Sequence, residues 1–128
     1  LKDPEILFNK NKQTIKLHFD MHHGYGILDK AIDVMNIKDR EEFRNFVNNK
    51  LKFSPHIMFI SKKKTMNKWF LSLFDWLSEC EKIFGFKNLN GYDQGRLYAY
   101  LSERYLPFWF EKYCKIKFGP WGFFDTEV

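Results

Sequence analysis

Hydrophobic residues recur at helical spacing over most of this chain. After Gly26, apolar side chains three or four positions apart predict a helix with one buried face. That face consists of Ile27, Leu28, Ala31, Ile32 and Met35. Another helix is expected from Asp39, because Glu42 three residues later completes an acidic variant of the capping box. Its predicted core residues are Phe43, Phe46 and Val47.

Two longer helices are predicted in the second half of the chain. One covers residues 64–84 and ends at Gly85, a residue that readily adopts a left-handed conformation. Its predicted buried face consists of Met66, Trp69, Phe70, Leu73, Leu77, Cys80 and Phe84. The other covers residues 92–113 and contains Pro107, which should kink or break it because proline has no backbone N–H.

Short strands are expected at two or three places. Residues 14–19 (TIKLHF) alternate weakly between apolar and polar, and residues 57–60 (IMFI) form an apolar run after Pro55. A third strand is expected at residues 116–118. The pattern therefore predicts a helix-dominated α/β domain.

Composition places the chain among globular domains. Its 128 residues correspond to one domain, and 45% hydrophobic content excludes a disordered chain. Fifteen Phe, six Tyr and four Trp suit sugar faces, nucleobases or a buried interface. No apolar run approaches the roughly 18 residues that span a membrane, and no secretory signal opens the chain. Cys80 and Cys114 lack CxxC spacing and are interpreted as reduced, buried thiols of a cytosolic protein.

The net charge of +5 is a modest basic excess, because 16 acidic residues accompany 21 basic ones. The excess could attract a nucleotide diphosphate or an anionic membrane, but a solvated lysine-rich surface is the simpler interpretation. The same alternatives apply to a basic cluster at the start of the long helix. A solvated surface is the simpler interpretation, and docking to an anionic leaflet is the more specific one. This cluster consists of Lys62, Lys63, Lys64 and Lys68.

Residues 88–111 (NLNGYDQGRLYAYLSERYLPFWFE) hold the densest candidate chemistry. A glycine-containing turn carries Tyr92, Asp93 and Gln94 into a helix, and the free N–H groups of a first helical turn favour an anion. Asp93 could be aimed into a cleft, or it could simply cap the helix.

Arg96, Glu103 and Arg104 follow in the same segment. Arg96 precedes Glu103 by seven residues, which places both on one helical face two turns apart. Glu103 and Arg104 are interpreted as a structural ion pair that fixes the helix. The alternative is an arginine that grips a diphosphate through its planar fork.

The segment GYDQGRLYAYLSERYLPFWFEK resembles the C-terminal signature of bacterial glycosyltransferases encoded in capsule and lipopolysaccharide gene clusters. Two upstream segments, HHGYGILDKAIDVM and SPHIMFISKKKTMNKWFLSLFDWLSECE, fit the same group in order, so the resemblance covers residues 22–111. It implies the acceptor-side, C-terminal part of a GT-A-like (Rossmann-like) α/β fold. The nucleotide-sugar-binding half is expected to precede this chain.

The resemblance also implies an activity and roles for individual residues. The enzyme would move a sugar from a nucleotide diphosphate donor to a growing surface polysaccharide. An Asp-Gln pair at a loop-to-helix junction faces the donor sugar in retaining GT-A enzymes, which implies catalysis by Asp93 and substrate binding by Tyr92, Gln94 and Arg96.

Three histidines are further candidates for substrate binding. His22 and His23 stand just before a predicted helix, and His56 precedes the apolar run at residues 57–60. His56 could also be a ligand of a divalent metal (Mn²⁺ or Mg²⁺) whose site is completed outside this chain, because no Asp-x-Asp segment occurs here. A histidine that is only a satisfied polar group is the simpler interpretation of each.

The expected partners are a nucleotide-sugar donor and a glycan or lipid-linked acceptor, at the inner face of the cytoplasmic membrane. A rival interpretation is a non-catalytic helical binding or scaffolding module. Nucleic-acid binding is not expected, because the chain lacks the interleaved basic and aromatic motifs of RNA-binding folds.

Overall fold

The fold is built from helices that follow one another closely along the chain. The computed structural model describes residues 6–7, 13–53 and 59–115. The helices are α1 (Ile15–His23), α2 (Ile27–Asp33), α3 (Ile37–Asn49), α4 (Lys63–Phe84), α5 (Gly91–Gly95) and α6 (Leu97–Tyr113). A single antiparallel pair, β1 (Ile6–Leu7) with β2 (Lys52–Phe53), is the β-structure of the described residues.

The predicted GT-A-like α/β fold is therefore wrong. Within the described residues, the two strands have two residues each and pair only with one another, so no parallel sheet for helices to cover is formed there. The domain is helical, and its core lies between helices.

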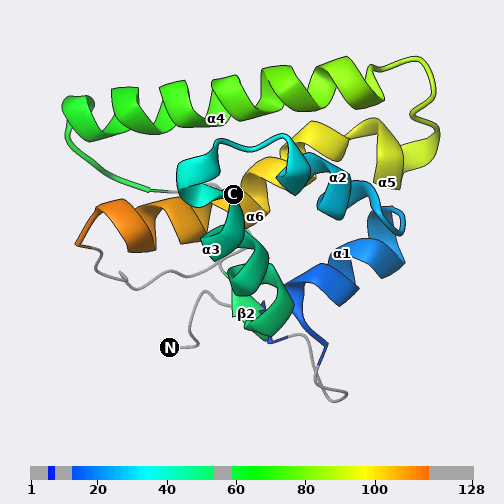
Figure 1. Ribbon diagram of the computed structural model, residues 1–128, viewed down its shortest axis with the longest axis horizontal. Coiled ribbons are helices and arrows are strands. Elements are labelled where there is room, and N and C mark those ends of the chain that lie inside the picture. Colours follow the sequence, from blue (N-terminus) through cyan, green and yellow to red (C-terminus); the bar gives the residue numbers. More distant parts are fainter. Residues whose placement is uncertain (1–5, 8–12, 54–58, 116–128) are drawn as a thin grey trace, which may run out of the picture.

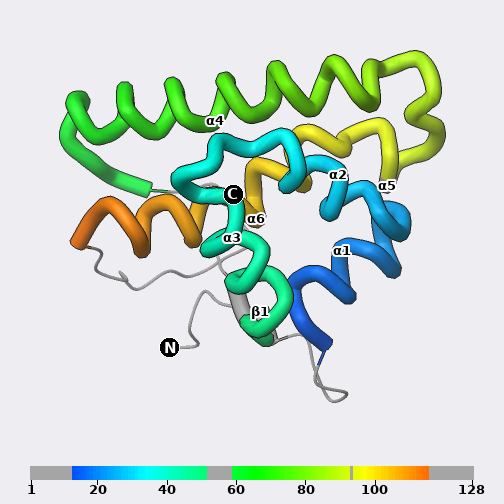
Figure 2. Tube along the Cα trace, viewed as in Figure 1, coloured from blue at the N-terminus to red at the C-terminus, as the bar shows by residue number. Residues whose placement is uncertain are grey.

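Helix α6 crosses the middle of the molecule and packs against α3 and α4. In Figure 1, α4 lies along one edge as the longest helix, α6 runs beneath it, and α3 crosses the view steeply. Both α3 and α4 pack on α6, while α1 packs on α2, α3 and α5. The trace in Figure 2 shows how α5 joins the returning chain after α4 to the start of α6.

The sequence of α6 explains its central position. Apolar residues follow a four-residue period at Leu97, Leu101 and Tyr105, and the second half of the helix is apolar almost all round. Its buried residues are Leu97, Leu101, Ser102, Arg104, Tyr105, Leu106, Phe108, Trp109 and Phe110. A helix buried on so many sides needs neighbours on each of them, which α3 and α4 partly supply.

Aromatic side chains fill the space between α3, α4 and α6. Trp69 and Trp76 of α4 meet the ring of Tyr105 edge-on, with centroids 5.3 and 5.0 Å apart. Phe43 of α3 lies 5.5 Å from the same ring. The indole N–H of Trp76 donates to the carbonyl oxygen of Ala31 at 2.7 Å, which ties α4 to α2. Packing in this helical core thus accounts for many of the Phe, Tyr and Trp residues of the chain.

Helix α1 replaces the strand predicted at residues 14–19. Thr14 is its N-cap, and its hydroxyl oxygen accepts the backbone N–H of Leu17 at 3.2 Å. The helix ends at Gly24, whose φ of 123° favours glycine and whose N–H bonds to the carbonyl oxygen of Asp20. The weak alternation in this segment was outweighed by a helical cap at each end.

The helices predicted after Gly26 and over residues 64–84 are confirmed by α2 and α4. Trp69, Leu73 and Cys80 are buried on one face of α4, as predicted. The predicted burial of Phe70 on that face is wrong, because 39% of this residue is exposed. Gly85 adopts a positive φ of 55° after the helix, but its ψ of −150° lies outside the left-handed helical region that its position suggested.

Two helix boundaries differ from those predicted. Helix α3 begins at Ile37, because the side chain of Asn36, rather than Asp39, accepts an N–H bond at its start. The segment over residues 92–113 breaks at Arg96, whose φ of −107° and ψ of 25° end α5 before α6 begins. Pro107 lies inside α6 and does not end it.

The buried strand predicted at residues 57–60 is wrong where the structure describes it. Phe59 is half-buried and packs on Phe110 with ring centroids 4.8 Å apart, but Ile60 is fully exposed, and neither lies in a strand. Residues 57–58 and the strand expected at 116–118 lie outside the described residues.

Two further sequence predictions concern the membrane and the thiols. None of the helices in the described ranges has both the length and the apolar character needed to cross a membrane. Cys80 is buried and Cys114 is half-buried, and both are free thiols. Burial raises the pKa of the Cys80 thiol to about 12, so this side chain serves as a core residue.

Candidate functional site

A group of titratable side chains lies between α1 and the first half of α6. We call it the histidine–arginine cluster, and it consists of His18, His22, His23, Tyr100, Glu103 and Arg104. Four of its residues were already named as site candidates from the sequence: His22 and His23 on α1, and Glu103 and Arg104 on α6. The structure brings these two pairs of residues, about 80 positions apart in sequence, into one place.

Arg104 joins the two helices. Its Nη2 lies 3.4 Å from Nδ1 of His18, and its guanidinium carbon lies 5.2 Å from the ring centroid of Phe19. Its Nη1 also donates to the carbonyl oxygen of Tyr100 at 3.1 Å. Only 2% of Arg104 is exposed, so its cation is held largely away from water against an aromatic face and an imidazole.

The three imidazoles lie close to one another along α1. The rings of His18 and His22, four residues apart, have centroids 4.3 Å from each other. His23 stacks on Tyr100 at 3.9 Å and is buried, whereas His22 is exposed. The cluster thus runs from a buried interior at Arg104 to a solvent-facing imidazole at His22.

Glu103 partly offsets the positive charge of the cluster. Its Oε2 lies 3.3 Å from Nη1 of Arg104, so the structure places the two partners of the predicted ion pair in contact. Burial lowers the pKa of Arg104 to about 10, and the Glu103 carboxylate counteracts this shift. At neutral pH the guanidinium stays charged, so the buried end of the cluster carries a fixed cation.

His18 is held neutral by its surroundings. Burial is the largest cause that lowers its pKa, to about 4, and the neighbouring His22, Arg104 and His23 add to the shift. A guanidinium has only donors, so Nδ1 of His18 must accept the bond from Arg104 and the proton must reside on Nε2. His18 is therefore an uncharged, oriented imidazole next to a permanent cation.

We expect His18 to remain neutral until the pH falls to about 4. Replacing Arg104 with methionine should raise the pKa of His18 while leaving it below the ordinary value near 6.5, because burial remains the main cause. The measurement is an NMR titration of the imidazole nitrogens.

The matched control is Arg44→Met, which removes an arginine that pairs with Asp33 on the surface and does not belong to the cluster. The pKa of His18 should be unchanged in that variant. A pKa of His18 near 6.5 in the wild-type protein would contradict the assignment of a neutral, buried imidazole.

The other predicted substrate-binding residues lie near this site, on and after α5, which packs on α1. Tyr92 is 70% exposed, and its hydroxyl oxygen accepts a bond from Nη1 of Arg96 at 2.9 Å. Gln94 accepts the backbone N–H of Asn90 at 3.4 Å through its side chain. Arg96 therefore contacts Tyr92 on the surface before α6 begins, where the sequence had placed it on the face of Glu103.

Two predicted residues cannot be placed in the site. Asp93 belongs to α5 by its backbone, but its side chain lies outside the part that the structure describes, as does the whole of His56. Over the described ranges, no three His, Cys, Asp or Glu residues are arranged to hold a metal ion. The divalent metal that the sequence suggested, with His56 as a ligand and a site completed outside this chain, therefore stays a prediction.

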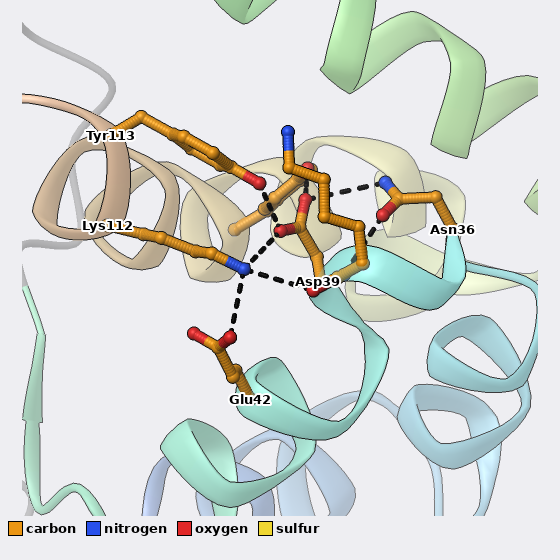
Figure 3. A network of polar contacts seen from close by, with 7 residues as sticks. Asn36, Asp39, Glu42, Lys112 and Tyr113 are labelled. Carbon is orange, nitrogen blue, oxygen red and sulfur yellow. Dashed lines mark hydrogen bonds and ion pairs between the residues drawn. The ribbon is translucent and has the colours of Figure 1, made fainter.

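A second polar centre lies between α3 and the end of α6 (Figure 3). The buried carboxylate of Asp39 accepts bonds from the hydroxyl of Tyr113 at 2.5 Å, from Nζ of Lys112 at 2.9 Å and from the hydroxyl of Tyr105 at 3.2 Å. Nδ2 of Asn36 is a further donor at 3.4 Å. The carboxylate is thus surrounded by donors from two helices.

The surroundings of Lys112 complete this centre. Its ammonium also donates to Glu42 at 3.1 Å and to the carbonyl oxygen of Lys38 at 3.0 Å. These contacts hold the end of α6 on the start of α3, and the ammonium of Lys112 points at the carboxylates of Asp39 and Glu42 (Figure 3). Because its donors are already used within the protein, we interpret the Asp39 centre as structural.

Sequence reasoning missed His18 and Tyr100. His18 fell in a segment predicted as a strand, and Tyr100 was counted only among the aromatics of its helix. A signal was available: Thr14 and Gly24 are suitable helix caps, and between them His18 and His22 have the four-residue spacing of one helical face. Pairing that face with Arg104 required the tertiary structure.

Comparison with known proteins gives one family and no named relative. Neither the curated proteins nor the solved structures contain a match to this chain. The model of the family described as a domain of unknown function (DUF4422) matches residues 2–114, a range that includes every described residue of the histidine–arginine cluster. The chain therefore belongs to the DUF4422 family of domains of unknown function.

Proposed function

We propose that this domain forms part of the active site of a glycosyltransferase that uses a nucleotide-sugar donor to extend a bacterial surface polysaccharide. The observation that supports the proposal is the histidine–arginine cluster, in which three imidazoles and a buried guanidinium converge beside α5. The motif resemblance, over residues 22–111, includes every residue of the cluster except His18. The function is proposed for a helical domain and makes no use of a GT-A sheet.

The cluster has the chemistry to bind the diphosphate of the donor. Arg104 supplies a fixed positive charge from a buried position, where electrostatic interactions are stronger than in water. His22 is exposed at the other end and can donate a hydrogen bond to a phosphate oxygen. In this arrangement Arg104 orients His18, and His22 makes the outer contact with the ligand.

Helix α5 would contact the sugar. The exposed ring of Tyr92 offers an apolar face to a sugar ring, and its hydroxyl is positioned by Arg96. In the proposed reaction an acceptor hydroxyl attacks the anomeric carbon, the bond from that carbon to the phosphate oxygen breaks, and the nucleoside diphosphate leaves. The acceptor's proton passes to a base, and Asp93 is proposed to stabilise the developing positive charge on the sugar.

The proposal places the protein on the cytoplasmic side of the inner membrane, with a glycan or lipid-linked acceptor. The competing proposal is a non-catalytic helical binding module. An apolar surface on α4 is the observation that favours it, since binding modules commonly expose such surfaces. The two proposals differ in turnover, which only the enzyme would show.

The test is release of nucleoside diphosphate by the full-length protein from a panel of uridine, guanosine and cytidine diphosphate sugars, with and without a polysaccharide acceptor. His22→Gln should lower kcat/KM by more than about tenfold, the usual size of a lost hydrogen-bonding or proton-transferring group. Met21→Gln is the matched control, because it introduces the same side chain at the preceding position of α1, where Met21 is exposed and outside the cluster.

Met21→Gln is expected to stay within about twofold of the wild type. Undiminished turnover by His22→Gln would remove this residue from the site. If no donor of the panel yields nucleoside diphosphate while the wild-type protein is folded, the binding-module proposal takes precedence.

A further inference from the structure

Helix α4 has apolar side chains on its outer face as well as on its core face. Phe70, Leu71 and Phe74 are all exposed, Leu71 by 67% and Phe74 by 58%. With Asn67 and Asp75 they line a shallow depression on the surface. We call the three apolar residues the α4 patch. Helix α4 packs on α6 and lies along one edge of the molecule (Figure 1). The α4 patch is exposed, so it lies on the face of α4 away from the core.

The chain next to the patch is strongly basic. Between residues 59 and 74 there are four lysines and no acidic residue. All four are exposed, and none of them forms an ion pair with a described acidic residue. They are Lys62, Lys63, Lys64 and Lys68, which we call the α4 lysines.

The helical spacing places the two features on one surface. Lys63, Asn67, Phe70 and Phe74 follow one another at intervals of three or four residues, so they lie on the same side of α4. Ile60, just before the helix, is fully exposed and adds an apolar side chain at the lysine end. The outer face of α4 therefore presents lysines at the start of the helix and phenylalanines further along it.

We propose that this outer face of α4 docks onto an anionic lipid surface. The α4 patch would enter the boundary between headgroups and acyl chains, with the helix parallel to the membrane, as interfacial helices do. The α4 lysines would meet the negative headgroups, and their long side chains can reach outward while the apolar residues are buried. The inference does not rest on the proposed function, since docking requires no turnover.

A lipid surface fits these residues better than a second copy of the chain. A stable protein interface buries about 800 Å² per partner around an apolar core. Three neighbouring apolar side chains form only a small core of that kind, and the four exposed α4 lysines, none paired with a described acidic residue, favour an extended negative surface. A membrane needs no shape complementarity, so a few apolar residues and a basic cluster are sufficient for reversible binding.

The experiment is flotation of the full-length protein with vesicles. One preparation contains equal parts of phosphatidylcholine and phosphatidylglycerol, and the other contains phosphatidylcholine alone. The wild-type protein should float with the anionic vesicles and remain unbound with the neutral ones. Replacing Phe70, Leu71 and Phe74 with serine should weaken partitioning by more than about tenfold, because the anchor in the acyl boundary is lost.

The control for the α4 patch is a triple serine variant of exposed apolar residues on other helices or turns, namely Met21, Tyr25 and Ile37. It should bind anionic vesicles as the wild type does. A second pair of variants tests the charge: glutamine at the four α4 lysines should weaken binding by more than about tenfold and flatten its dependence on salt. Glutamine at Lys30, Lys50, Lys87 and Lys115, which are also exposed, should have a much smaller effect.

Three results would overturn the proposal. The first is a wild-type protein that does not float with anionic vesicles. The second is equal loss of binding in the α4 lysine variant and in its four-lysine control, which would mean that net charge alone is responsible. The third is a dimer in solution, measured by light scattering, that becomes monomeric in the α4 patch variant, because the patch would then be covered by a second copy.

Discussion

Asp39→Ala is expected to lower the free energy of unfolding by about 3–5 kcal/mol, the cost of removing one partner from a buried ion pair. Asp39 is 2% exposed and accepts bonds from Tyr105, Lys112, Tyr113 and Asn36. Without its carboxylate, the hydroxyls of Tyr105 and Tyr113 lose their acceptor, and the ammonium of Lys112 keeps only Glu42 and the Lys38 carbonyl. Chemical denaturation monitored by circular dichroism would measure the change.

The matched control is Asp33→Ala, which also removes a carboxylate from an ion pair. The side chain of Asp33 is 64% exposed, and it lies 2.8 Å from Nη2 of Arg44. A pair in contact with water contributes about 0–1 kcal/mol, so this variant should be nearly as stable as the wild type. Equal losses in the two variants would contradict the structural role assigned to the buried Asp39 centre.

The stability difference between the wild type and Asp39→Ala should also depend on pH. Burial alone would raise the pKa of Asp39, but the bonds from Tyr113 and Lys112 outweigh it and hold this pKa below its usual range. In the unfolded chain the pKa is near 3.9, so on acidification the unfolded state takes up its proton first. The stability difference between the wild type and Asp39→Ala should therefore have its full size above about pH 5. It should shrink as the pH falls through 4 toward 3.

Trp69→Ala is the second change with a large expected effect, a loss of about 3–5 kcal/mol in the free energy of unfolding. Trp69 has no exposed surface, and its ring lies 5.3 Å from Tyr105 and 5.5 Å from Trp109. Alanine would leave a cavity at the contact of α4 with α6 that the surrounding rings can fill only in part. Thermal or chemical denaturation would measure the loss.

The neighbouring residue supplies the control. Phe70→Ala removes an aromatic ring from the next position of the same helix, but this ring lies on the outer face and is 39% exposed. Its loss should cost less than about 1.5 kcal/mol, since it leaves no cavity in the core. If Phe70→Ala were as destabilising as Trp69→Ala, the outer face of α4 would have to be buried in the protein, and lipid docking would fail with it.

Helix positions with regular periodicity and clear stops were predictable from the sequence. Residues 64–84 have apolar residues at helical spacing up to Gly85, and they form α4. The start of α3 was misplaced because Asp39 followed by Glu42 resembles a capping box, although Asn36 three residues earlier has the same capping ability. Local signals identify a helix well and its ends less well, because several nearby residues can supply the cap.

The candidate site was predictable only in pieces. His22, His23, Glu103 and Arg104 were selected for their chemistry and their motifs, and each belongs to the histidine–arginine cluster. Nothing local indicates that Arg104 lies 3.4 Å from His18, since these residues are 86 positions apart. Such a contact depends on how α1 and α6 pack, which is a property of the whole core.

Spacing and side-chain chemistry were enough to predict where most helices lie, that aromatic residues dominate the core, and which segment carries unusual polar residues. The packing of the helices was needed to establish that the fold is helical rather than α/β, that Asp39 is a buried acceptor, and that Phe70 and Phe74 face outward on α4. The reason is physical: periodicity shows that a helix has an apolar side, but when apolar residues occur on both sides, the neighbours that pack against it choose the buried one.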